Sequence, residues 1–224
     1  IVWGDGQPKT IEQISYADAN MVSETEYLYI IETIQADSTL SIRLKAQYIV
    51  LFIFGYRFGL RFSEALRIQY RDVQADTSAV CLNVHNSIFG DTKSAAGIRM
   101  VPLLEKMTRL ETDALQQVLD YSEIHFQTDE QAPLMAEQQG GRNLINRFIC
   151  ARDIGMYLKA LTGDNKLRYH HLRHSWATRM YAYHAESNFK NSKKNIIKSS
   201  VIDLFWQDFV GEHDCQYPLR SIAA

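Results

Sequence analysis

The segment from Leu40 to Phe58 constrains the fold more than any other part of the sequence. Its apolar residues are so dense that, in a helix, they would cover every side, which is typical of a helix at the centre of a core. Its most apolar stretch, Ala46 to Tyr56 (AQYIVLFIFGY), is well short of the ~20 residues that a membrane-spanning helix needs. We therefore expect a buried helix that ends at Gly59.

The composition supplies enough apolar material for such a core. Hydrophobic residues make up 46% of the 224 residues and aromatic residues 11%, which excludes disordered, collagen-like and low-complexity chains. Cys81, Cys150 and Cys215 form no CxxC pair, so the sequence favours neither a disulfide framework nor a structural zinc site and fits a reducing cytosol. No repeat or linker divides the chain, which predicts one domain over 1–224. The opening IVWGDGQPKT has no methionine and no signal segment, so a fragment of a longer protein is expected.

Local patterns predict a mainly helical α+β fold around that helix. Residues 1–38 are polar and predict a lead-in segment with short helices, and Ser63 is expected to cap a short helix. Strands over 79–84, 86–89 and 98–103, with a turn over 90–97, predict a small antiparallel three-stranded sheet spanning 79–103. The remaining chain predicts helices over 104–126, 143–162 and 171–185, loops over 127–141 and 186–200, and an apolar stretch over 201–209.

Charge is distributed unevenly along the chain. The net charge is −2, which by itself argues against a nucleic-acid-binding protein. Between Arg142 and Lys198, however, twelve Lys and Arg residues face three acidic residues, a net +9 that leaves −11 for the rest. This asymmetry predicts an electropositive face that binds a polyanion, with an ordinary solvated helix surface as the alternative.

Arg61 stands in the stretch GLRFSEAL (59–66), at a glycine-broken junction beside the hydrophobic run. A guanidinium in such a place is costly unless it is paired or binds an anion. A surface ion pair between Arg61 and Glu64 is the alternative explanation.

A second cluster, RYHHLRHSWAT (168–178), places His170, Arg173 and His174 on one helical face. The two histidines have the spacing of a zinc site. No glutamate stands between them, however, and Arg173 would repel a cation, so no metal is expected. Imidazole and guanidinium groups on one face suit a phosphate instead. Histidines that are satisfied in the core are the alternative. A third stretch, TKSAAGIRMVPL (92–103), carries Lys93 in a turn, where a lone lysine is ordinarily just solvated.

In this order, the three stretches resemble the catalytic domain of the tyrosine recombinase (phage integrase) family. GLRFSEAL is similar to the family's first arginine box, TKSAAGIRMVPL to its β-hairpin lysine and following strand, and HHLRHSWAT to its His-x-x-Arg box. The intervals of 32 residues from Arg61 to Lys93 and 77 from Lys93 to His170 fit this order. The resemblance covers roughly residues 40–185 and implies the DNA breaking–rejoining fold, without a cofactor.

The resemblance also implies a role for each motif residue. Arg61 and Arg173 would hold the non-bridging oxygens of one DNA phosphate, Lys93 would protonate the departing 5′ oxygen, and His170 would assist. Glu64 would orient the first arginine box and His174 would support the site. Candidates for further DNA contacts are Arg168, Arg179, Lys193 and Lys194. The implied partners are duplex DNA and, for a full-length parent, three more copies in a tetramer on DNA, with no membrane. A bacterial or phage cytoplasm is the expected location.

The family's Gly-His box and nucleophilic tyrosine fit poorly. The candidates His213 and Tyr217 lie only four residues apart, where the family has about nine, and Pro218 follows directly. The third histidine and the tyrosine are therefore expected beyond residue 224, with an insertion over 186–210. The sequence thus predicts a catalytic-domain fragment of a site-specific recombinase that itself does not cleave DNA. Two alternatives remain: a non-catalytic DNA-binding or regulatory module of the same fold, and a helical protein–protein module.

Overall fold

The computed structural model describes residues 20–75, 80–92, 97–126, 129, 131–137 and 143–193, with their side chains except those of Ala75 and 183–193. Its helices are α2 (Glu24–Ala36), α3 (Ile42–Tyr56), α4 (Phe62–Arg67), α5 (Arg109–Phe126), α6 (Arg147–Thr162) and α7 (Tyr169–Lys193). A short turn of 3-10 helix, η1 (Tyr70–Asp72), leads into strands β1 (Val73–Ala75), β2 (Val80–Val84) and β3 (Arg99–Pro102). The expected mainly helical fold with a small three-stranded antiparallel sheet is confirmed.

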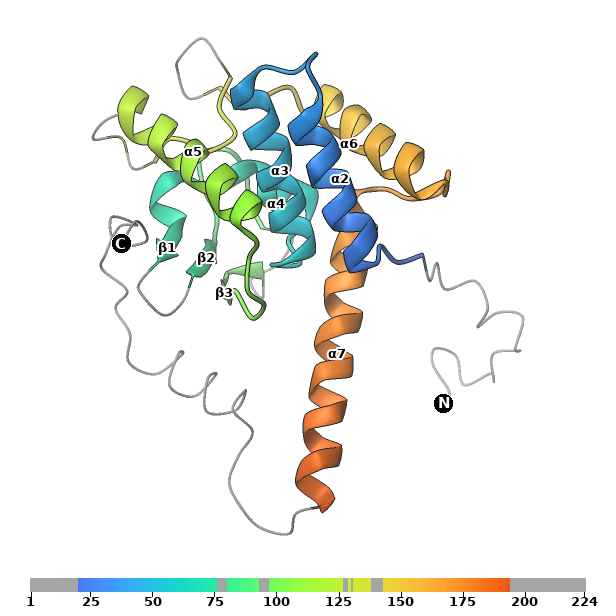
Figure 1. The fold of residues 1–224 in the computed structure, drawn as a ribbon. Helices are drawn as coiled ribbons and strands as arrows, with labels where there is room; N and C mark the ends of the chain where they lie inside the picture. Colours follow the sequence, from blue (N-terminus) through green and yellow to red (C-terminus); the bar gives the residue numbers. More distant parts are fainter. Residues whose placement is uncertain are drawn as a thin grey trace, which may run out of the picture.

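Helix α3 forms the centre of the core. Every residue from Ala46 to Tyr56 is buried, and α2, α4, α5 and α7 all contact this helix (Figure 1). Ser41 caps its start by accepting a hydrogen bond from the Leu44 N–H at 3.3 Å. The buried helix expected within 40–58 is therefore confirmed, because apolar density on all sides leaves it no stable place but the interior.

The segment before α3 is more regular than its polar composition predicted. Within the expected lead-in, α2 runs for 13 residues. Ser23 accepts from the Glu26 N–H at 3.2 Å, and the Glu26 carboxylate accepts from the Ser23 N–H at 2.8 Å, forming a capping box. The buried face of α2 consists of Tyr27, Ile30, Ile31 and Ile34. This spacing is that of one helical stripe, so the signal was present in the sequence.

Three short antiparallel strands lie in the order β1-β2-β3. Leu82 in β2 pairs with Val73 in β1 and with Val101 in β3. Two of the expected strands are confirmed, but residues 86–89 form a tight turn instead. In this turn the Ser87 side chain accepts from the Phe89 N–H at 3.2 Å, and Ser87 and Gly90 form an isolated bridge. The first strand is therefore β1, which the sequence reading missed.

Helix α4 begins one residue after Arg61, so the expectation that Ser63 caps it is wrong. Ser63 lies inside the first turn, and the cap position belongs to Arg61. The Glu64 carboxylate accepts a hydrogen bond from the Arg61 N–H at 2.8 Å. A carboxylate in the first turn of a helix satisfies this otherwise unpaired donor and complements the helix dipole.

Helices α6 and α7 complete the described chain. Asn146 caps α6, and Gly163 ends it in a left-handed conformation with φ 73°. Helix α7 begins two residues before the expected start and continues to Lys193. The loop expected over 186–200 is therefore wrong over 186–193, because these residues extend α7. The insertion expected over 186–210 stays a prediction. Residues 194–210 lie outside the described residues.

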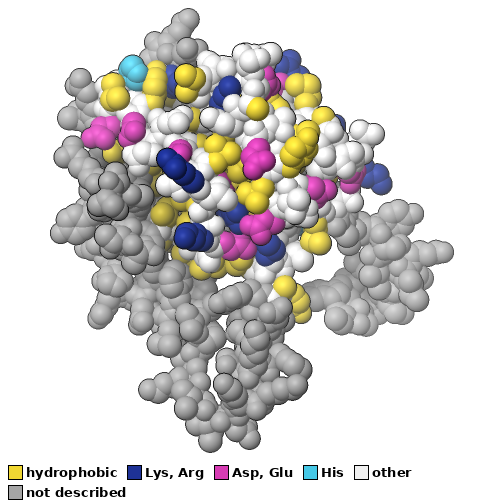
Figure 2. All heavy atoms as spheres, viewed as in Figure 1, with side chains coloured by type: hydrophobic (Ala, Val, Ile, Leu, Met, Phe, Trp, Pro, Cys, Tyr) yellow, Lys and Arg dark blue, Asp and Glu magenta, His cyan; other side chains and the backbone are white. Residues whose placement is uncertain are grey.

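The face in Figure 2 carries basic and acidic side chains that are interspersed among apolar ones, over α2, α3 and α5. None of the described helices combines the length and hydrophobicity that a bilayer crossing requires.

Candidate active site

Gly59 is the point at which the end of α3 meets α7. Its φ of +64° is one that other residues rarely adopt, and a Cβ added there would lie 2.4 Å from the indole ring of Trp176. The Arg173 guanidinium, one turn before Trp176 on α7, donates a hydrogen bond to the Gly59 carbonyl. The absence of a side chain at Gly59 thus allows α7 to bring Arg173 against the turn that carries Arg61.

Arg61 and Glu64 form an ion pair in which the carboxylate is buried. Arg61 Nη1 lies 2.9 Å from Glu64 Oε1, and the side chains are 42% and 3% exposed. The pair that the alternative explanation expects is therefore present, but its carboxylate is buried and does not lie on the surface. Arg99, the first residue of β3, also approaches Glu64, with Nη2 at 2.9 Å from Oε2. One buried carboxylate thus holds two guanidinium groups.

Electrostatic coupling joins these residues to Arg173. Burial raises the pKa of Glu64, but hydrogen bonds from Arg99 and Arg61 outweigh burial and bring it to about 2. Glu64 is therefore ionised at neutral pH. Burial, followed by repulsion from Arg61 and Arg99, lowers the pKa of Arg173. Three arginines that face one carboxylate leave a local excess of two positive charges, which is an environment that attracts an anion.

Of the three histidines in the first two turns of α7, two are exposed and one is buried. The rings of His170 and His174 are exposed and lie edge to face, with centroids 4.3 Å apart. Burial, then repulsion from His174 and other neighbouring cations including Arg173 and Arg61, lowers the pKa of His170. His170 is therefore mainly a neutral hydrogen-bonding group at pH 7. His171 is buried and accepts a hydrogen bond from the Arg168 N–H at 2.9 Å. Of these three histidines, it is the one that fits the alternative of a histidine satisfied in the core.

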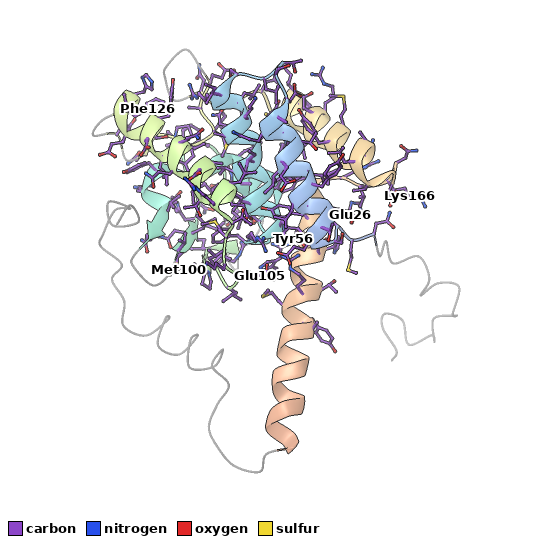
Figure 3. All side chains as sticks on the ribbon, viewed as in Figure 1. Glu26, Tyr56, Met100, Glu105, Phe126 and Lys166 are labelled. Atoms are coloured by element: carbon purple, nitrogen blue, oxygen red, sulfur yellow. The ribbon has the colours of Figure 1, made fainter. Side chains whose placement is uncertain are left out.

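Arg179, an expected DNA contact, is held within an ion network at the end of α3. It donates to Glu105 at 2.9 Å and to the Tyr56 carbonyl at 2.6 Å. Tyr56 and Glu105 lie close together there (Figure 3). The same network includes Arg57, which is 3% exposed and pairs with Glu105 at 2.9 Å and with Glu111, also at 2.9 Å. These partners give Arg179 a role in joining α7 to the end of α3 and to the loop that leads into α5.

The remaining expected site residues are divided between the surface and the undescribed chain. Arg168 is exposed just before α7. Lys93, Lys194, His213 and Tyr217 lie outside the described residues, as does the side chain of Lys193. No group of three or more His, Cys, Asp or Glu in the described part of the chain is arranged to hold a metal ion.

Arg99 is the site residue that the sequence reading missed. It lies 35 residues from Glu64 along the chain, and the register that pairs Arg99 with Val84 determines where it stands. The only available sign was its place in the stretch that follows Lys93.

Comparisons with known proteins agree with this fold. The model of the phage integrase family matches residues 20–189. The structure is similar to XerH site-specific recombinase bound to difH substrate, with TM-score 0.56 and 19% identity over 74% of this chain and 43% of that one. The XerA recombinase gives TM-score 0.51 and 20% identity over 87% and 65%, respectively. For the Tn1549 transposon integrase in complex with transposon right end DNA, the TM-score is 0.50 and the identity 18%, over 74% of this chain and 54% of the integrase chain.

This chain thus spans less than half of the XerH chain that it matches. A search of curated proteins finds no match.

Proposed function

The chain belongs to the phage integrase family, and from this premise we propose that it provides the phosphate-binding core of a site-specific DNA recombinase. The observation that carries the proposal is the convergence of Arg61, Arg173 and His170 at the junction of α3 and α4, where burial and then repulsion between neighbouring cations lower the pKa values of His170 and Arg173. Cations already in place beside one another suit a phosphodiester, whose negative charge grows on its non-bridging oxygens towards the transition state.

In the proposed reaction, Arg61 and Arg173 donate hydrogen bonds to the two non-bridging oxygens of the scissile phosphate. His170, neutral at pH 7, adds a further donor. A tyrosine hydroxyl attacks phosphorus and gives up its proton to water, the bond from phosphorus to the 5′ oxygen breaks, and Lys93 gives its proton to that oxygen. The resulting 3′-phosphotyrosyl bond keeps the strand end activated for rejoining. No metal is needed in this scheme, because the guanidinium groups stabilise the charge.

Binding to duplex DNA tests the phosphate-binding part of the proposal. We expect residues 1–224 to bind a fluorescein-labelled duplex, with affinity that falls steeply as salt rises, because bound cations release counterions. Arg61→Gln and Arg173→Gln should each weaken binding and reduce the salt slope by about 1. Arg109→Gln is the matched control, since that side chain is 94% exposed on α5. Equal binding by all of these variants would contradict the proposal.

A nicked suicide substrate tests the chemistry. We expect no covalent adduct from residues 1–224 on a denaturing gel, since no tyrosine follows His213 at the family's spacing. An adduct that disappears on Tyr217→Phe would instead identify Tyr217 as the nucleophile. The same spacing favours a second candidate function, a DNA-binding module without chemistry. An adduct formed only by a longer chain that supplies the tyrosine would exclude this module. Assembly of a tetramer on DNA stays a prediction.

A further inference from the structure

Arg99 links the small sheet to the arginine-binding carboxylate. Its side chain is 26% exposed. Nη2 donates to Glu64 Oε2 at 2.9 Å, and Nη1 approaches Glu64 Oε1 at 3.3 Å. Nη1 also donates to the Gly97 carbonyl at 2.8 Å, so a contact within its own strand region fixes the guanidinium. Met100, the next residue of β3, marks this position in Figure 3.

Each oxygen of the Glu64 carboxylate serves both arginines. Oε1 accepts from Arg61 Nη1 at 2.9 Å and faces Arg99 Nη1. Oε2 accepts from the Arg61 backbone N–H at 2.8 Å and from Arg99 Nη2. A carboxylate held from two sides cannot rotate without losing charge-assisted hydrogen bonds. Without Arg99, Glu64 would keep partners only from its own helix turn.

We propose that Arg99 is a positioning residue of the phosphate site: through Glu64, it holds the Arg61 guanidinium in place for an incoming phosphate. Both terminal nitrogens of Arg99 are engaged by Glu64 and Gly97, which leaves Arg61 as the more exposed cation. An arginine that is already held loses less conformational freedom when an anion binds, so its affinity for the anion is higher. The phosphate part of this inference rests on the proposed function, whereas the restraint on Arg61 does not.

NMR of arginine side chains separates these two parts. The full chain, labelled with ¹⁵N-arginine, is titrated with inorganic phosphate while the Nε–H signals of Arg61 and Arg173 are followed. In the wild type we expect both signals to shift together. In Arg99→Gln, the Arg61 signal should need up to about tenfold more phosphate, because an unrestrained Arg61 side chain loses more conformational freedom when it binds. The hydrogen bond from Arg173 to Gly59 should persist.

Arg99→Lys distinguishes positioning from charge. Lysine keeps the positive charge but cannot grip both carboxylate oxygens with a planar fork. Positioning predicts that Arg99→Lys weakens phosphate binding at Arg61 several-fold, whereas a titration identical to that of the wild type would overturn the proposal. If Arg99→Gln does not fold, the phosphate titration of Arg99→Lys is compared with that of the wild type instead. Arg109→Gln controls for the loss of one surface charge.

The mobility of Arg61 without phosphate tests the restraint alone. Heteronuclear NOE values for Arg61 Nε–H should fall in both Arg99 variants, and the carboxyl pKa of Glu64 should rise. Unchanged values in both would overturn the proposal. If the wild-type Arg61 and Arg173 signals do not shift with phosphate while the NOE falls in the variants, the proposed function is contradicted. The restraint of Arg61 by Arg99 is then still supported.

Discussion

Position 59 requires glycine for two reasons: its backbone φ is positive, and Trp176 occupies the space that a Cβ would need. In Gly59→Ala, the left-handed conformation costs about 1–2 kcal/mol, and contact with Trp176 adds to this cost. We expect a loss of about 3 kcal/mol in the free energy of unfolding, measured with urea.

Gly155→Ala is the matched control for this substitution. Gly155 lies inside α6 with no atom within 4 Å of an added Cβ. Alanine there should stabilise the protein by about 0.5–1 kcal/mol, because glycine is a poor helix former. A similar loss from both substitutions would contradict the role assigned to the turn.

The pKa of His170 should lie below the ordinary histidine value of about 6.5, because burial and then His174 disfavour its charged form. His174→Gln removes the nearest ring and is expected to raise the pKa of His170, as followed by its NMR signal from pH 4 to 8. The folded protein binds fewer protons here than the unfolded chain. Its stability should therefore fall as pH drops below about 6.5. A His170 pKa that does not move would contradict the coupling, and His125→Gln on α5 is the control.

At the scale of elements, a buried ion pair and its hydrogen bonds join α2, α3 and α5. Glu111 is fully buried, and accepts from Arg57 at 2.9 Å and from the Tyr27 hydroxyl at 2.6 Å. Glu111→Gln leaves the buried Arg57 with fewer partners and should cost about 3 kcal/mol in chemical denaturation. Glu24→Gln removes a partner that is 59% exposed and should cost less than about 1 kcal/mol. Equal losses of unfolding free energy in the two variants would contradict the conclusion that the buried pair contributes more than the exposed one.

Glu111 and Glu105 also determine how the free energy of unfolding depends on pH in acid. Although burial raises the pKa of Glu111, hydrogen bonds from Arg57 and other donors lower it below the ordinary 4.5. Arg179 and Arg57 likewise overcome burial at Glu105. The stabilisation is therefore complete above about pH 4.5 and is lost as pH falls further. Denaturation curves between pH 7 and pH 2 should show this decline, and a flat profile would contradict it.

The sequence predicts an element well when the residues that specify it lie within that element, and poorly when they lie far away in the chain. The apolar density of α3, and for α6 the cap Asn146 with the terminator Gly163, are local signals that specify a helix. Strand β1 has only three residues and is defined by its pairing with β2. Ile88 and Phe89 favour a strand, but the bridge from Ser87 to Gly90 closes a turn. The site divides similarly: motifs locate Arg61 and Arg173, whereas pairing across the sheet brings in Arg99.

At the scale of the whole molecule, the site joins three distant parts of the chain: the turn after α3, strand β3 and helix α7. Three guanidinium groups around Glu64 repel one another when no anion is present. A bound phosphate should therefore raise the thermal midpoint, by an amount equivalent to about 2.7 kcal/mol at a concentration of 100 Kd. Differential scanning calorimetry measures this. Arg61→Gln should abolish most of the shift, and an equal shift in that variant would place the anion elsewhere.

The indole under Gly59 gives the protein its own optical probe. Of the three tryptophans in the sequence, Trp176 is the one within the described residues, and it touches the turn whose carbonyl holds Arg173. Its buried ring nitrogen has no hydrogen-bond partner in the described structure. Its emission will therefore respond to small displacements of that turn and to the charge beside it. With the other two tryptophans of the sequence replaced, binding of an anion at the arginine cluster should become readable as Trp176 fluorescence, without any attached dye.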